Sequence, residues 1–131
     1  MPKTFFQLAD EAMAQAHAIS AKEALQELER DSSVLLVDVR DESEVKATGL
    51  GAGAVNAPGI SLAWKADLEV PEEYREPELK DRSRRIITTC GSSPCYRGAS
   101  AVNLLTDMGF TNVSYVEGGM QSLLDAGIAT E

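Results

Sequence analysis

The sequence contains few of the residue types that most often indicate a function. Among 131 residues there are two cysteines, one tryptophan and one histidine, His17. No apolar run is long enough to span a membrane, and the N-terminus turns acidic at Asp10 and Glu11 instead of forming a secretory signal. Two cysteines in one short loop are typical of a reducing compartment, not of a disulfide scaffold. We therefore expect a cytoplasmic protein without a membrane partner.

Positive charge is also scarce. Twelve Lys and Arg residues stand against 21 Asp and Glu, which gives a net charge of -9. Nucleic-acid surfaces need clustered basic residues, so we expect no nucleic-acid partner. The length suits one domain with a single core, and hydrophobic and charged contents of 44% and 25% are those of an ordinary globular protein.

Helical and extended patterns alternate along the chain. Apolar runs predict strands at 18–19, 34–39, 54–56, 85–89 and 112–116, and helical spacing predicts helices at 4–16, 21–30, 41–47, 97–108 and 119–126. Segment 61–84 is expected to form one or two surface helices with loops. Apolar strands separated by helices predict an α/β fold, a mostly parallel sheet of about five strands with helices on both faces. We divide the chain into an N-terminal helical extension (1–17) and one domain (18–131).

Cys90 is the strongest candidate for chemistry. It follows the predicted strand at 85–89, and a turn from Gly91 to Pro94 leads into the next helix. Loop amides and a helix N-terminus favour a charged thiolate without a metal or cofactor. His17 is the only histidine, so we expect activation to come from the electrostatics of the loop. The residues Asp38–Arg40 and 117–119 also follow strands, and parallel strands bring such ends into one crevice.

We assign the other site residues by their chemistry. Arg97 offers a charged fork for a donor oxyanion. The remaining loop residues are expected to bind substrate: Gly91, Ser92, Ser93, Cys95 and Tyr96. Cys95 is open to three interpretations: a second sulfur site, a resolving thiol, or a bystander, with the bystander or a redox-protective role ranked ahead of direct catalysis. We interpret four residues as structural support, Asp38 and Arg40 as an ion pair and Gly118 and Gly119 as a tight turn whose amides can line the pocket.

Several segments together resemble the single-domain rhodaneses. They are Leu36–Glu44, Gly53–Pro58, the Cys90 loop ending in Arg97, Asp107–Val113 and Val116–Gly119, and they occur in consistent order over roughly residues 18–127. The resemblance implies an α/β fold of that family and a cysteine that accepts a sulfane sulfur as a persulfide. It also implies a small anionic sulfur donor such as thiosulfate, and a thiol, cyanide-like or protein acceptor.

Three features depart from the family pattern. Six residues separate Cys90 from Arg97, where single-domain rhodaneses usually have four and the related phosphatases and arsenate reductases have five. The stretch Gly49–Gly53 contains no histidine, and Gly98 replaces the usual serine after the arginine. We therefore expect a wider or differently folded pocket.

Two alternatives to a sulfurtransferase stay open. One is a cysteine-dependent phosphatase or arsenate reductase with an enlarged anion loop. The other is a non-catalytic redox sensor in which Cys90 and Cys95 interconvert between dithiol and disulfide. The sulfurtransferase interpretation is preferred because the resemblance spans most of the chain.

Overall fold

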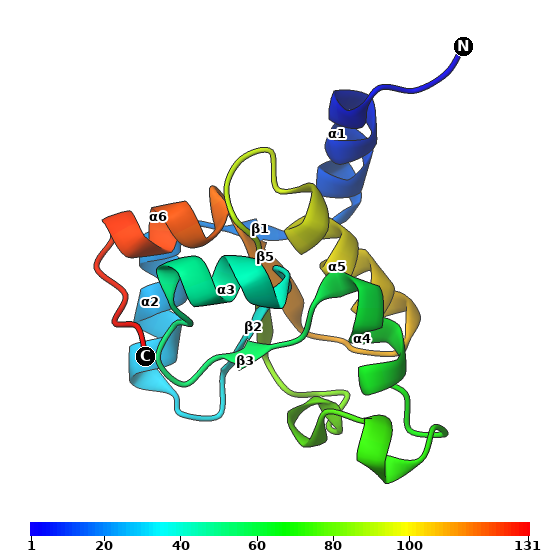
Figure 1. Ribbon diagram of the computed structural model, residues 1–131, viewed down its shortest axis with the longest axis vertical. Coiled ribbons are helices and arrows are strands. Elements are labelled where there is room, and N and C mark those ends of the chain that lie inside the picture. Colours follow the sequence, from blue (N-terminus) through cyan, green and yellow to red (C-terminus); the bar gives the residue numbers. More distant parts are fainter.

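A computed structural model describes residues 1–131, and a five-stranded parallel sheet forms its centre (Figure 1). The strands are short because each apolar run is short. In spatial order they are β1 (Ala18–Ile19), β5 (Val113–Val116), β4 (Ile86–Thr89), β2 (Leu35–Asp38) and β3 (Val55–Asn56). All four neighbouring pairs are parallel. The predicted α/β class is confirmed, and the sheet is parallel throughout.

Helices cover both faces of this sheet. The chain forms α1 (Phe5–Gln15), α2 (Ala21–Arg30), α3 (Glu42–Thr48), α4 (Gly59–Lys65), α5 (Tyr96–Asp107) and α6 (Gly119–Asp125), with two 3₁₀ turns at Glu72–Tyr74 and Pro77–Leu79. One buried cluster joins α4 and α5 to one sheet face, and a smaller cluster joins α2 and α6 to the other. None of the helices has the length and apolarity that a membrane-spanning helix needs.

Strand β4 determines where the Cys90 side chain points. Successive side chains of a strand alternate between the sheet faces, so Ile86, Thr88 and Cys90 face α5. Thr88 lies against that helix, because its Oγ1 donates to the carbonyl oxygen of Gly98 at 2.8 Å. The thiol of residue 90 is thereby directed toward the first turn of α5.

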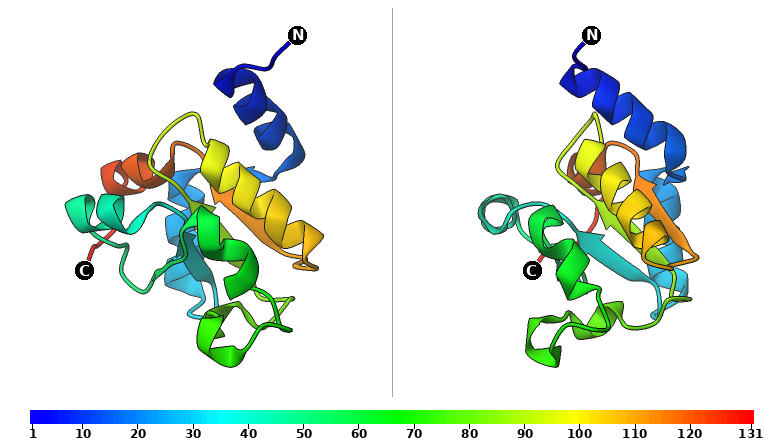
Figure 2. Two further views of the ribbon diagram at one scale, coloured as in Figure 1. Left: turned by 45° about the vertical axis from the view of Figure 1, so that its right-hand side comes forward. Right: turned by 90° about the vertical axis from the view of Figure 1, so that its right-hand side faces the viewer.

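Helix α1 packs across α5 and extends beyond the sheet (Figure 2). Ala9 and Ala12 are buried, and the side-chain amide of Asn103 donates to the carbonyl oxygen of Ala12 at 3.1 Å. The rings of Phe5 and Tyr96 meet edge to face with centroids 5.7 Å apart. The N-terminal extension is therefore attached to the helix that follows the Cys90 loop.

Candidate functional site

A pocket of about 500 Å³ lies where β4 ends and α5 begins. The structure brings six of the predicted site residues together in its wall: Cys90, Gly91, Ser92, Ser93, Tyr96 and Arg97. Phe5, Glu44 and Pro94 complete the lining. Five other predicted residues lie outside it: Cys95, Asp38, Arg40, Gly118 and Gly119. Cys95 and the two glycines therefore do not line this pocket, contrary to the expectation for the glycine amides, whereas substrate binding by Cys95 stays a prediction.

Cys90 and Cys95 form a buried pair of thiols. Both are free and each is about 2% exposed. Their side chains are hydrogen-bonded to each other. The Gly98 amide is hydrogen-bonded to the Cys90 sulfur, and the Gly118 and Gly119 amides are hydrogen-bonded to the Cys95 sulfur. Each sulfur therefore has backbone dipoles of its own, and the two share a proton.

The acidity within the pair differs from the sequence-based expectation. The hydrogen bond with Cys95 and burial raise the pKa of Cys90 above its ordinary value. The hydrogen bond from Cys90 and the amides of the α6 turn lower the pKa of Cys95 to about 6. The prediction that Cys90 itself carries the charge differs from these directions, which favour the anion on Cys95. Within the pair Cys95 is the more acidic thiol, and Cys90 donates the hydrogen bond between them.

The start of α6 holds the Cys90 backbone in place. The amide of Met120 donates to the carbonyl oxygen of Cys90 at 2.6 Å, and that of Gln121 donates to the carbonyl oxygen of Gly91 at 3.0 Å. Gly119 has a φ of +62°, and a Cβ there would lie 2.6 Å from the Cys90 carbonyl oxygen. Only glycine fits this approach, so the turn at 118–119 supports the loop and Cys95, not the pocket.

Asp38 and Arg40 form a buried ion pair beside the site. The Arg40 guanidinium donates to both Asp38 carboxylate oxygens at 2.8–3.1 Å, and both side chains are nearly inaccessible to solvent. Arg40 also donates to Thr48 Oγ1 at 2.6 Å and to the Gly49 carbonyl oxygen at 3.1 Å. Asn56 donates to the backbone carbonyls of both residues. The pair thus ties the end of β2 to α3 and to the glycine-rich stretch.

The guanidinium of Arg97 is already paired with a carboxylate. Its two terminal nitrogens donate to the two carboxylate oxygens of Glu44 at 2.5 and 3.0 Å. These bonds lower the pKa of Glu44 and raise that of Arg97. The guanidinium is the only cation in the pocket lining, and Glu44 is the only carboxylate. An incoming anion therefore competes with Glu44 for Arg97.

Sequence reasoning missed Glu44 and Phe5 as lining residues. Glu44 belongs to a capping box with Asp41 at the start of α3, and that local role hid its contact with a residue 53 positions away. The sequence offered one indication of a functional role, because Glu44 ends the Leu36–Glu44 segment that resembles the rhodaneses. Phe5 gave no signal, because only the packing of α1 on α5 brings it to the pocket.

The shared proton predicts a low first pKa for the thiol pair. Ultraviolet absorbance of thiolate should show one thiolate per chain at neutral pH, lost as the pH falls through about 6. In Cys90→Ala this transition should move to higher pH, because the variant has no side-chain donor for Cys95 and the largest cause of its lowered pKa is removed. A wild-type chain that forms no thiolate until the range of an ordinary cysteine would contradict the shared-proton arrangement.

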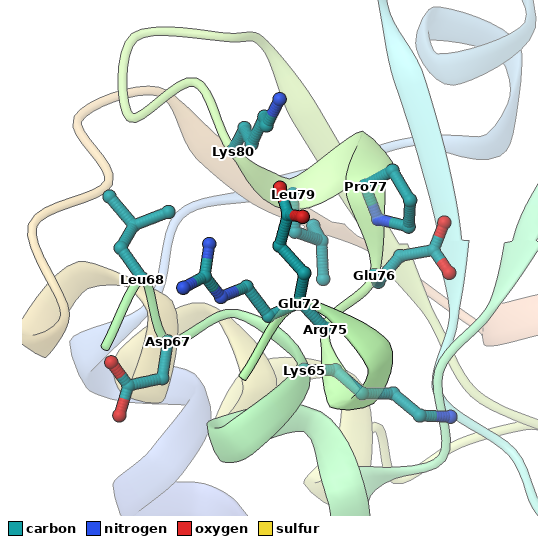
Figure 3. Close-up of a pocket in the computed structure, with 9 residues that line it drawn as sticks. All are labelled: Lys65, Asp67, Leu68, Glu72, Arg75, Glu76, Pro77, Leu79 and Lys80. Atoms are coloured by element: carbon teal, nitrogen blue, oxygen red, sulfur yellow. The ribbon is translucent and has the colours of Figure 1, made fainter. Parts of the chain in front are cut away.

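A second pocket lies in the segment between α4 and β4 (Figure 3). Charged side chains of both signs surround it, among them Lys65, Glu72 and Arg75, and it contains neither cysteine. In Figure 1 this segment lies at the opposite end of the sheet from the loop that follows β4. The Cys90 pocket is the one that combines a nucleophile with a cation at the carboxyl end of a parallel strand.

A comparison with protein families finds one family that matches most of the chain. The family described as Rhodanese-like domain matches residues 20–126, from the end of β1 through α6. The chain belongs to the rhodanese-like family. The expected resemblance is confirmed, and helix α1 lies outside the matched segment.

Several solved structures resemble this chain. A protein of unknown function from Rhodopseudomonas palustris, described as a possible tyrosine phosphatase, has 26% identity, a TM-score of 0.84 and coverage of 100% of this chain and 99% of its own. Human single-domain sulfurtransferase TSTD1 has 25% identity, a TM-score of 0.70 and coverage of 84% and 96%. A protein from Anabaena has 27% identity, a TM-score of 0.69 and coverage of 86% and 90%. No curated protein matches the sequence.

Proposed function

We propose that this rhodanese-like protein is a sulfurtransferase in which Cys90 carries a sulfane sulfur as a persulfide. The donor is a small anion such as thiosulfate, and the acceptor is a thiol, a cyanide-like nucleophile or a protein thiol. One observation supports this most strongly: the Cys90 thiol lines a pocket with Arg97 and is hydrogen-bonded to a second thiol that can take its proton. The likeness to a human sulfurtransferase points the same way.

The first step transfers sulfur to Cys90. Its proton passes to the Cys95 thiolate, and the freed Cys90 sulfur attacks the outer sulfur of thiosulfate. The sulfur–sulfur bond of thiosulfate breaks, and sulfite leaves with the electron pair. Cys95 thus does the work of a general base in a site without histidine. The Gly98 amide and the charge of Arg97, which favour the ionised form of Cys90, stabilise the persulfide anion.

The second step returns Cys90 to its resting state. The acceptor attacks the outer sulfur of the persulfide, and the Cys90 sulfur leaves as a thiolate that recovers its proton from Cys95. Sulfite leaves as a stable anion, and the Cys90 thiolate is neutralised by the proton that Cys95 holds, so neither step needs an acid from outside the thiol pair.

The phosphatase alternative is less well supported by the same pocket. The longer loop and the likeness to the Rhodopseudomonas protein favour it. However, hydrolysis of a phosphate ester requires an acid to protonate the leaving alcohol. Glu44 is the only carboxyl group in the lining, and its contacts with Arg97 lower its pKa. It is therefore ionised when an acid is needed.

Stoichiometric sulfite release tests the proposal. Fully reduced chain mixed with thiosulfate should release about one sulfite per chain, and Cys90→Ser should release none. An aryl phosphate should not be hydrolysed by either protein. Hydrolysis of the aryl phosphate without any sulfite would establish the phosphatase alternative and overturn the proposal.

A further inference from the structure

Only one of the two cysteines lines the pocket. Cys90 lines the cavity, whereas Cys95 contacts Cys90 without lining it. The Cys95 sulfur lies 3.5 Å from the carbonyl oxygen of Val116 and is hydrogen-bonded to the turn that begins α6. A sulfur bound to Cys90 has room in the cavity that this residue lines. Cys95 therefore contacts the Cys90 sulfur from outside the cavity lining.

We propose that Cys95 is a resolving thiol that displaces the transferred sulfur from Cys90 as hydrosulfide and leaves a Cys90–Cys95 disulfide. This inference rests on the proposed function, because it begins from the Cys90 persulfide. It adds a second activity to the site, the reduction of a sulfane sulfur to sulfide at the expense of a dithiol.

Atoms and electrons balance without an external oxidant. After the first step Cys90 carries a persulfide anion and Cys95 holds the proton. That proton passes to the outer sulfur, and the Cys95 sulfur attacks the Cys90 sulfur. The Cys95–Cys90 bond forms, the bond from Cys90 to the outer sulfur breaks, and hydrosulfide leaves with the electron pair and the proton. The sulfane sulfur gains two electrons, and the two cysteines lose them.

The environment of Cys95 suits an attacking thiol. Amides of Gly118 and Gly119 favour its anion and hold its sulfur beside Cys90. A thiol whose pKa lies near the ambient pH attacks disulfide sulfur most effectively. Attack within one loop also avoids the entropy cost of bringing in a second molecule. External acceptors that enter through the cavity meet the outer sulfur and compete with this route.

The disulfide must be reduced before another cycle. A dithiol reductant, small or proteinaceous, can do this by exchange through a mixed disulfide. Continuous turnover with thiosulfate alone is therefore expected to stop after one cycle and to resume when dithiothreitol is added. A dithiol-containing reductant is the class of partner that this cycle requires.

A single-turnover experiment without oxygen tests the inference. The reduced full-length chain, freed of reductant, is mixed with thiosulfate, and sulfite, sulfide and intact mass are measured at completion. Wild type should release about one sulfite and about one sulfide per chain and become two hydrogens lighter. Cys95→Ser lacks the group that accepts the Cys90 proton, so it should release sulfite more slowly. At completion it should have yielded at least about tenfold less sulfide than wild type and gained one sulfur in mass. A sample without thiosulfate should keep its mass, which excludes oxidation by air.

The outcomes separate the two proposals. If wild type releases sulfite but keeps the added sulfur and forms no disulfide, the resolving role is wrong and the sulfurtransferase stands. If wild type releases no sulfite, the proposed function fails, and the resolving role fails with it. The wild-type mass decides between these outcomes even if Cys95→Ser does not fold, and Cys95→Ala provides a second variant.

Discussion

Arg97→Ala is expected to lower kcat/KM for thiosulfate by about 100-fold, the usual effect of removing one group that stabilises developing negative charge. Arg97 is the only cation in the pocket lining, and its charge favours the ionised form of Cys90. The substitution removes both the attraction for the dianion and the stabilisation of the persulfide. Steady-state kinetics with cyanide as acceptor and a dithiol present would measure the loss.

Two matched variants sharpen this prediction. Arg97→Lys keeps the charge but not the planar fork, so its kcat/KM should fall between those of wild type and Arg97→Ala. Glu44→Gln removes the carboxylate that is paired with the Arg97 guanidinium. Thiosulfate then has no anionic competitor for Arg97, so KM for thiosulfate should fall. Unchanged kinetics in Arg97→Ala would remove this residue from the site.

Asp38→Asn should lower the free energy of unfolding by about 3–5 kcal/mol. The change leaves the Arg40 guanidinium buried without its counter-charge, since both side chains are almost fully inaccessible. Arg40 also ties β2 to Thr48 and Gly49, so the end of the strand beside the pocket loosens with the pair. Urea denaturation of the two proteins would measure the difference.

A double variant separates the buried charge from other causes. Arg40→Met in the Asp38→Asn background removes the uncompensated charge and should restore part of the lost stability. A single Asp38→Asn variant that loses less than about 1 kcal/mol would show that the pair does not support the fold in the way the structure indicates.

The fold could be predicted from the sequence because its signals are local. The apolar runs at 34–39, 85–89 and 112–116 and the helical patterns between them require neighbouring residues only. The capping box that Ser20 and Glu23 form at the start of α2 also depends on neighbouring residues only. Parallel pairing follows from the alternation of these elements, so the five strands and their order along the chain could be predicted.

The site could be predicted only in part, because its decisive contacts are not local. Cys90 was identified by the strand, turn and helix that flank it, and six predicted residues line one pocket. The bond from Arg97 to Glu44 and the contact of Phe5 with Tyr96 join distant segments. The distribution of charge between the thiols depends on the α6 turn, whose amides meet Cys95 only in the folded chain.

The most direct test of the central claim is the mass of Cys95→Ser after prolonged treatment with thiosulfate, because this variant lacks the proton acceptor of Cys90 and reacts slowly, followed by removal of the excess. Only Cys90 can then hold a sulfur. We expect a chain one sulfur heavier, with the added atom on the peptide that contains Cys90, and the original mass restored by cyanide with release of thiocyanate. A folded variant whose mass is unchanged by thiosulfate would contradict the account.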